Sequence, residues 1–258
     1  MTVFKQIRRN DSGCVTYLVG SKDTADCVNV DPLLDVDFVV EEARKEGFDR
    51  ISHVIDTHTH ADHVSGAGNL CNRFNLPGIW MHANSGRKSK TLPVHDGDKL
   101  SLDNTTLRFL YTPGHTYDHV CIVVDDSKVL KGDTMLIGDA GRIDLGGDPR
   151  EKSDKLYDSL HGKLLTLPDA VQVYPTHVGA AHHLGSAKTF STIANEKLAN
   201  AALKVNGKED FFKCMTEDWP PKPPDYQNII RVNLSDDPLP ELVSDEELHK
   251  YLGKNQRK

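Results

Sequence analysis

The feature that most restricts this chain is a run of metal-ligand residue types at positions 57–63, which reads T-H-T-H-A-D-H. The run follows the apolar segment 51–55, whose composition favours a short strand. In extended backbone its first two histidines point to the same side, since side chains repeat every second residue. Transition metals bind such imidazole and carboxylate groups, so the run indicates a metal centre at the end of a strand. Its ligand-type residues are His58, His60, Asp62 and His63.

The composition is that of an ordinary soluble protein that folds as one domain, or as one domain with an appendage. The chain has 258 residues, 38% of them hydrophobic, and a formal net charge of −7. An acidic chain lacks the basic face that nucleic-acid binding needs, so no nucleic-acid partner is expected. No apolar run is long enough to cross a bilayer and residues 1–6 lack the features of a targeting sequence, so no membrane partner is expected.

Five cysteines lie far apart in the sequence and form no C-x-x-C pair. An odd and scattered set is typical of reduced thiols rather than of a disulfide framework. We therefore expect a cytoplasmic protein. The cysteines are Cys14, Cys27, Cys71, Cys121 and Cys214.

Hydrophobic patterning predicts a chain that mixes strands and helices. Asp62 and His63 are expected to open the second of the helices. Strands are expected at residues 14–19, 27–30, 51–55, 78–81, 107–111, 119–124, 128–131 and 171–174. Helices are expected at residues 36–46, 64–74, 149–167 and 187–204.

The composition shifts beyond residue 206. The run W-P-P-K-P-P at residues 219–224 cannot form a regular helix or a central strand, so we expect an extended arm laid against the core. A capping box, Ser244 followed by Glu247, predicts a terminal helix. The chain thus divides into a catalytic domain, 1–205, and a C-terminal extension, 206–258.

Three later residues share the setting of the first run, because each follows an apolar strand. They are His115, Asp133 and His177. Gly114 and Gly132 precede the first two and let the backbone approach closely. Taken singly, each of the three is more often a turn or core residue than a ligand. Together with the first run, and in this order, they predict a single metal site.

The whole series resembles the metallo-β-lactamase superfamily. Its motifs are the first run, T-P-G-H-T at 112–116, G-D at 132–133 and Y-P-T-H at 174–177. The resemblance covers about residues 10–205 and implies an αββα sandwich of the α/β (α+β) class, with the metal at one edge between two sheets. The proline-rich C-terminal extension follows this fold.

Within that superfamily the chain resembles the persulfide dioxygenases, which are sulfur dioxygenases related to glyoxalase II. The resemblance lies in G-D-T-M-L-I at 132–137, A-G-R-I-D at 140–144 and the proline-rich arm at 219–226. It implies one Fe(II) per chain, held by His58, His115 and Asp133. Two imidazoles and one carboxylate on one face of the metal leave adjacent positions open for a persulfide sulfur and O₂.

The implied reaction oxidises a low-molecular-weight thiol persulfide, of glutathione or coenzyme A, with O₂ to sulfite and the free thiol. The resemblance makes His177 and Asp62 catalytic and, with His60 and His63, places them around the metal to fix tautomers and hold water. In hydrolases of the superfamily the same four positions help to build a second metal site. Arg142 is expected to bind the substrate through its fork of donors, or else to form a salt bridge with Asp144 or Asp139.

Two departures from the family pattern leave the carrier thiol open. Ala140 stands where a cysteine is common, and the segment V-G-A-A-H-H at 178–183 matches neither known continuation. Asp139, Gly141, Arg142 and the pair His182 and His183 are expected to surround the entrance to the site.

Other readings of the sequence remain open. The first is a thioester hydrolase of glyoxalase II type with two Zn per chain, in which a metal-bound hydroxide attacks a carbonyl. A metal-loaded sensor or scaffold is the least favoured. Residues 239–248 resemble the opening helix of a rhodanese domain, which suggests a separate sulfurtransferase as a partner that supplies the persulfide.

Overall fold

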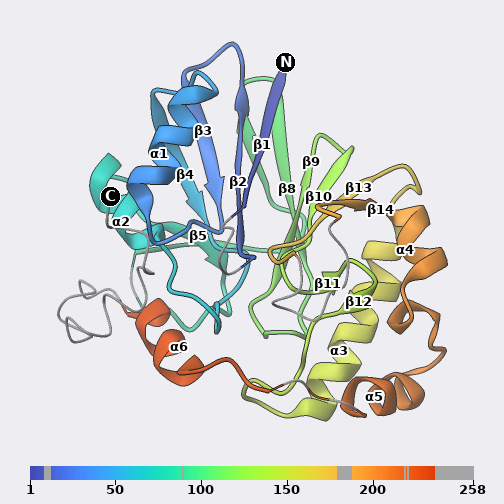
Figure 1. The fold of residues 1–258 in the computed structure, drawn as a ribbon. Coiled ribbons are helices and arrows are strands. Elements are labelled where there is room, and N and C mark those ends of the chain that lie inside the picture. The colour runs from blue at the N-terminus through green and yellow to red at the C-terminus, as the bar shows by residue number, and fades with distance from the viewer. Residues whose placement is uncertain (9–12, 89, 179–187, 218, 220, 236–258) are drawn as a thin grey trace.

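The computed structural model describes residues 1–8, 13–88, 90–178, 188–217, 219 and 221–235. Within them two six-stranded sheets face each other (Figure 1). The first sheet runs in chain order through β1 (Thr2–Arg8), β2 (Val15–Ser21), β3 (Asp26–Val30), β4 (Arg50–Ile55), β5 (Ile79–His82) and β6 (Thr91–Val94). The second has the order β14 (Ser191–Thr192), β13 (Gln172–Tyr174), β10 (Lys128–Leu130), β9 (Val120–Val124), β8 (Thr105–Tyr111) and β7 (Lys99–Leu102).

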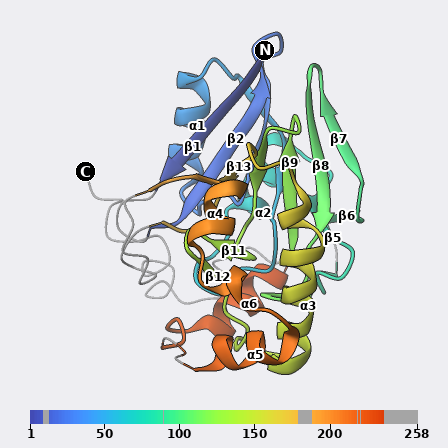
Figure 2. The ribbon, with the colours of Figure 1, turned by 90° about the vertical axis from the view of Figure 1, so that its right-hand side faces the viewer.

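Helices cover the outer face of each sheet. The first sheet carries α1 (Val36–Lys45) and α2 (Ala67–Phe74), and the second carries α3 (Pro149–Gly162), α4 (Ile193–Ala199) and α5 (Lys208–Thr216) (Figure 2). The remaining elements are the hairpin β11 (Met135–Leu136) and β12 (Asp139–Ala140), the 3₁₀ turns η1 (Leu164–Thr166) and η3 (Ala202–Lys204), and α6 (Tyr226–Leu234). None of the helices in the described part of the chain is long and apolar enough to span a membrane.

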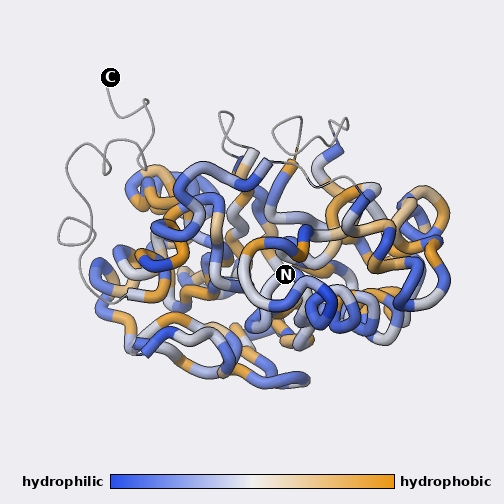
Figure 3. The backbone as a smooth tube through the Cα atoms, turned by 90° about the horizontal axis from the view of Figure 1, so that it is seen from below, coloured by the Kyte–Doolittle hydropathy of each residue, from blue (hydrophilic) through white to orange (hydrophobic). Residues whose placement is uncertain are grey.

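Three hydrophobic layers hold this αββα arrangement together. The central layer lies between the sheets and includes Tyr17, Val28 and Phe109. One outer layer joins the first sheet to α1 and α2, and the other joins the second sheet to α3, α4 and α5. Strands such as β2 and β9 are therefore buried along their whole length, and hydrophobic and hydrophilic stretches are interspersed along the backbone (Figure 3). The predicted sandwich is confirmed.

Each stretch predicted to be a strand contains one, with the ends shifted by a few residues. The first helix is also confirmed, since α1 covers Val36–Lys45 and Asp35 caps its first turn through a bond from the Phe38 amide. Six strands among the described residues lie outside the predicted ranges, namely β1, β6, β7, β11, β12 and β14. β1 pairs in register with β2 along seven residues, and β14 is too short to give a pattern of its own.

The prediction that Asp62 and His63 open a helix is wrong, because α2 begins only at Ala67. The preceding loop is held by other contacts. The Ser65 amide donates to Asn233 Oδ1 at 2.9 Å, and Asn233 Nδ2 donates to the carbonyls of His60 and His63 at 3.0 and 2.9 Å. These bonds come from α6, far away in sequence, so no local pattern could reveal them.

The helix predicted over 187–204 is only partly present. Ser191 and Thr192 form β14 against β13, and α4 follows with the Thr192 hydroxyl accepting from the Asn195 amide. Asn200 ends the helix and donates to the Asp139 carbonyl at 2.9 Å. The helix predicted over 149–167 likewise ends at Gly162, and a 3₁₀ turn continues it.

The C-terminal extension contains two helices, α5 and α6, that the sequence did not predict. Residues 219 and 221–223 have no regular secondary structure, in line with the expected arm. The terminal helix predicted from Ser244 lies outside the described residues. The boundary at residue 205 stays a prediction. However, α5 lies directly after it and buries Phe211 in the same layer as α3.

We expect Phe211→Ala to lower the free energy of unfolding by about 3–5 kcal/mol, because it removes a fully buried ring from a layer that the second sheet shares. Phe38→Ala is the matched control, since Phe38 is 38% exposed on α1, and its effect should be much smaller. Urea unfolding of both variants measures the difference. A change confined to a separate minor transition would show instead that the extension unfolds on its own.

Candidate metal centre

The ends of several strands meet at one edge between the two sheets. β4 leads into the run at 57–63, while β10 and β13 are parallel neighbours and therefore deliver Asp133 and His177 at the same edge. His115 follows β8. Gly132 makes the approach possible, because its φ is +48° and a Cβ there would lie 2.4 Å from His119 Nε2. The structure thus brings together the strand-end residues that the sequence singled out.

Three of these residues form a compact and buried set of donors. The donor atoms of His58, His115 and Asp133 lie within 4.8 Å of one another. The Nε2 atoms of both histidines are 3.8 Å from Asp133 Oδ2. His58 Nε2 is buried and has no hydrogen-bond partner within the described chain, although a buried nitrogen normally finds one. That pattern fits a cation at the centre of the set.

The outer nitrogens of both histidines fix their tautomers. His115 Nδ1 donates to the Arg142 carbonyl at 2.8 Å. His58 Nδ1 lies 2.9 Å from the Thr57 hydroxyl, which itself donates to Asp31, so the imidazole must be the donor. Each Nε2 therefore presents a lone pair toward Asp133, as a metal ligand requires.

The charges in this set suit a divalent cation. Burial, together with the neighbouring His60 and His119, holds the pKa of His58 well below its usual value, and burial also lowers the pKa of His115. Burial raises the pKa of Asp133, but the charge of His177 and its hydrogen bond outweigh this and bring it well below the usual range. The set is therefore two neutral imidazoles and one carboxylate, the ligands that non-haem iron takes in a facial triad.

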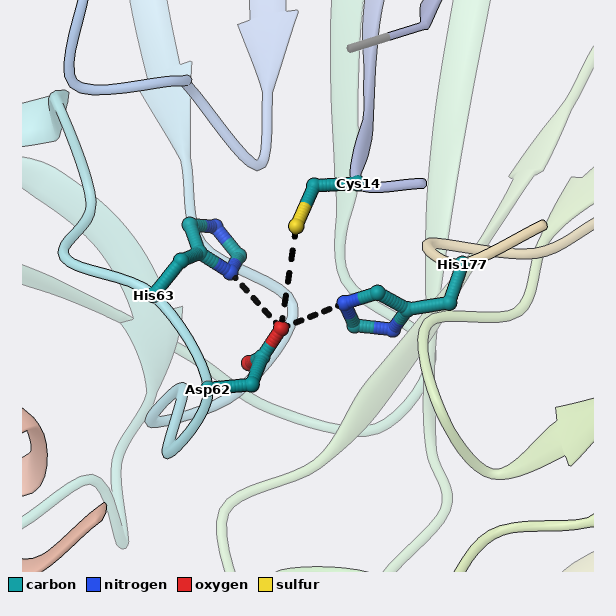
Figure 4. A group of neighbouring side chains, drawn as sticks. All are labelled: Cys14, Asp62, His63 and His177. Atoms are coloured by element: carbon teal, nitrogen blue, oxygen red, sulfur yellow. Dashed lines mark hydrogen bonds and ion pairs between the residues drawn. The ribbon is translucent and has the colours of Figure 1, made fainter. Parts of the chain in front are cut away.

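A second cluster adjoins the first and converges on Asp62 (Figure 4). Its Oδ2 atom lies 2.5 Å from His177 Nε2, 3.1 Å from His63 Nδ1 and 3.8 Å from Cys14 Sγ. The other nitrogen of His177, Nδ1, donates to Asp133 Oδ1 at 2.8 Å. His177 thus links the two clusters, with a carboxylate at each of its nitrogens.

This second cluster carries protonated imidazoles. Burial lowers the pKa of His177 and of His63, but the carboxylates beside them outweigh burial and raise both well above the usual value. Burial raises the pKa of the Cys14 thiol, yet the charges of His63 and His177 lower it to about 6. The two clusters therefore differ in charge, since one has neutral imidazoles and the other has imidazolium ions.

His60 was grouped with Asp62, His63 and His177 from the sequence, and its ring centroid lies 4.2 Å from that of His58 and 4.4 Å from that of His63. Its Nε2 atom lies 3.1 Å from Asp31 Oδ1, in a third buried group with Asp56. Its Nδ1 atom is buried without a partner among the described residues. The role of His60 beside the metal therefore stays a prediction.

Four residues near the centre were missed by the sequence reasoning, namely Cys14, Asp31, Asp118 and His119. Asp118 accepts from both the amide and the hydroxyl of Thr59. His119 accepts from the Asp133 amide at 3.0 Å, and its ring stacks on that of His58 at 4.9 Å. Asp31 follows β3 directly, so the strand-end argument could have found it.

Arg142 is held by a salt bridge. Its Nε and Nη2 atoms donate to the two oxygens of Asp144 at 2.7 and 2.8 Å, and Nη1 donates to the Pro221 carbonyl at 3.0 Å. Of the two roles considered for it, this geometry favours the salt bridge with Asp144. A contact with substrate stays a prediction.

A cleft of about 640 Å³ leads from the metal centre toward α5 and the proline-rich arm. Asp139, Gly141 and Arg142 line it, as expected for its entrance, whereas His182 and His183 lie outside the described residues. Its remaining wall is largely apolar and comes from several elements, with Leu136, Ala140, Leu145, Met215, Trp219, Pro221, Lys222 and Pro223 among its residues. The cleft is large enough for a small organic molecule.

Comparisons with known proteins agree with this geometry. The family model described as "Metallo-beta-lactamase superfamily" matches residues 9–177. The chain is 32% identical over 235 residues to "Persulfide dioxygenase ETHE1, mitochondrial" of Bos taurus, covering 90% of this chain and 87% of that one. It is 34% identical over 163 residues to a hydroxyacylglutathione hydrolase of Rhodopseudomonas palustris (strain BisA53), covering 62% and 61%. The crystal structure of ETHE1 from Myxococcus xanthus superposes with a TM-score of 0.80 at 30% identity, covering 90% of this chain and 98% of that one.

The geometry predicts different outcomes for two histidines. His58→Ala removes one of three donors, so the purified protein should lose nearly all bound metal. His177→Ala leaves the three donors in place, so much of the metal should remain while turnover falls. Metal analysis of both variants tests this, with His161→Ala on α3 as the control. Retention of metal by His58→Ala would show that the donor set is different.

Proposed function

Because this chain belongs to the metallo-β-lactamase superfamily and, within it, to the persulfide dioxygenases, we propose that it oxidises the persulfide of a low-molecular-weight thiol with O₂ to sulfite and the free thiol. The observation that carries the proposal is the donor set of His58, His115 and Asp133 beside the cleft, in which His58 Nε2 is buried and has no hydrogen-bond partner among the described residues. In the neighbouring cluster His63 and His177 instead lie against the carboxylates of Asp62 and Asp133. That difference in geometry favours one metal over two.

We propose that His58, His115 and Asp133 hold this single metal as Fe(II). Bound iron would supply the one-electron chemistry that O₂ needs before it reacts with a sulfur compound. His115 and Asp133 also line the cleft, so a molecule bound there would lie beside the donors of the iron. Substrate and O₂ would then meet in a fixed orientation.

The proton on His177 orients Asp133 in this scheme. His177 Nδ1 donates it to Asp133 Oδ1 at 2.8 Å, and Asp133 Oδ2 is left to face His58 and His115. Asp62 holds the other side of the ring. We therefore propose that His177 orients the Asp133 carboxylate and that Asp62 orients His177.

A second candidate function is thioester hydrolysis with two Zn per chain, as in glyoxalase II. The hydroxyacylglutathione hydrolase likeness and the position of Asp62, His63 and His177 beside Asp133 favour it. A second metal would require His63 and His177 to lose their protons, which costs free energy. His58 and His115 are neutral and carry no such cost.

We propose that the cleft binds the carrier thiol, with glutathione and coenzyme A persulfide as the candidates. Lys222 and Arg142 are cations along its wall, and carboxylate or phosphate groups of the carrier would lie near them. A separate sulfurtransferase as the source of the persulfide, and a cytoplasmic location, stay predictions. All five cysteines are outside disulfides, which agrees with a reducing compartment.

Protein purified with iron supplementation should contain about one iron per chain. It should consume O₂ and release sulfite when glutathione persulfide or coenzyme A persulfide is added. An oxygen electrode, a sulfite assay and metal analysis on the same sample make the test. Two tightly bound zinc ions, thioester hydrolysis and no O₂ uptake would establish the hydrolase instead.

Arg142→Ala should leave the iron content unchanged, because His115 bonds to the backbone carbonyl at that position. If the guanidinium also contacts the carrier, KM for glutathione persulfide should rise several-fold. Asp144→Asn is the matched control, since it weakens the salt bridge but keeps the arginine. Equal losses of melting temperature in both variants, with KM unchanged, would give Arg142 a purely structural role.

A further inference from the structure

Cys14 occupies a fixed place beside the metal centre. It forms an isolated β-bridge with His177, at the point where the two sheets meet. The bonds on either side are Val15 N to the Thr176 carbonyl at 2.8 Å and Val178 N to the Gly13 carbonyl at 3.0 Å. The backbone of Cys14 is thus tied to the strand end that carries His177.

Glycine before the cysteine makes this close approach possible. Gly13 has a φ of +73°, and a Cβ there would lie 2.4 Å from the Val178 carbonyl oxygen. Any other residue would push the two segments apart. The residue before the Cys14 thiol therefore has a backbone conformation and a close contact that only glycine allows.

The thiol lies against charged groups that lead to the metal ligands. Cys14 Sγ, His63, His177 and Asp62 present atoms within 4.8 Å of one another (Figure 4). Asp133 lies on the other side of the His177 ring, with its Oδ1 atom 2.8 Å from His177 Nδ1. Cys14 is itself buried, but it lines the cleft together with His115 and Asp133, so a molecule bound there lies against it.

The other cysteines lack this setting. Cys27 and Cys71 belong to the same hydrophobic layer as Cys14 and Cys121 to another, but these three do not line the cleft. Cys214 lines the cleft from α5, but it is an exposed residue and does not belong to the cluster around Asp62. Only Cys14 among the five combines access from the cleft with neighbouring imidazoles.

We propose that Cys14 accepts the outer sulfur of a persulfide bound in the cleft and holds it as a protein persulfide next to Asp133. This inference rests on the proposed function for the identity of the ligand. In the step, Cys14 Sγ forms a bond to the outer sulfur of the substrate, and the S–S bond of the substrate breaks. The carrier leaves as a thiolate with the electron pair of that bond, and the proton given up by Cys14 ends on it. One persulfide and one thiol become another persulfide and another thiol, so no oxidant or reductant is needed.

Such a transfer separates the sulfur from its carrier before oxidation. The cleft then has to hold the carrier only long enough for exchange, and the sulfur to be oxidised stays at a fixed distance from the metal ligands. Persulfides of different thiols, including that of a sulfurtransferase, would deliver the same protein-bound sulfur.

The test uses the iron-loaded full chain under strict exclusion of O₂. The protein is mixed with glutathione persulfide, freed from the excess and weighed intact by mass spectrometry. Wild type should gain the mass of one sulfur atom, and peptide mapping should locate it at Cys14. Cys14→Ser should not gain it, while Cys214→Ser, the matched control from the same cleft, should gain it as wild type does. Iron content and melting temperature of each variant show that it has folded.

Peptide mapping of the wild type decides the matter even if a variant fails to fold. Sulfur on Cys214 alone, or no bound sulfur at all, overturns the inference. The failure is distinct from that of the proposed function, because O₂ uptake and sulfite release are measured separately. A protein that makes sulfite without ever carrying sulfur on Cys14 refutes only the transfer. A protein that loads Cys14 but takes up no O₂ refutes only the dioxygenase.

Discussion

The centre depends on the hydrogen bond between Asp133 Oδ1 and His177 Nδ1. A carboxylate that is buried without a partner loses its hydration and tends to take up a proton, which would end its use as a ligand. His177 prevents this while no metal is bound, a bound cation would do so in its place, and Asp62 in turn keeps His177 charged. The bond exists because β10 and β13 are parallel neighbours, so the residues that follow them emerge side by side.

The same bond divides the site into two parts with different chemistry. On one side are neutral imidazoles with lone pairs directed inward, and on the other are imidazolium ions with a thiol among them. Charge alternates from Asp133 through His177 to Asp62 and His63, so each buried charge has an opposite neighbour. Replacing one member of such a network by a neutral residue strongly destabilises the fold, because the opposite charge is left buried without a partner.

The residues that the sequence correctly brought to one sheet edge are those whose position follows from local chain order. A polar ligand-type residue after an apolar strand must emerge at a sheet edge, and this identified His58, His115, Asp133 and His177. The role of Cys14 depends instead on a bridge between the two sheets, which no local pattern encodes. The contact of His60 with Asp31 likewise joins residues that are far apart in the sequence.

The fold follows the same division. Apolar runs located the strands and α1, because burial on the sheets demands that pattern. The start of α2 and the two helices of the extension depend on partners distant in sequence, so they were misplaced or missed. Phe211 and Asn233 show this, since one completes a hydrophobic layer and the other holds a loop.

The contact between Asn233 and the loop that joins β4 to α2 has a consequence for how the protein is made. Asn233 bonds to the carbonyl of His60 across a sequence separation of 173 residues. The ribosome synthesises the chain from the N-terminus onward, so the loop is made long before the Asn233 side chain that holds it. These bonds can therefore hold the loop only once α6 has emerged. A metal site whose loop depends on them would be completed only after translation has passed α6.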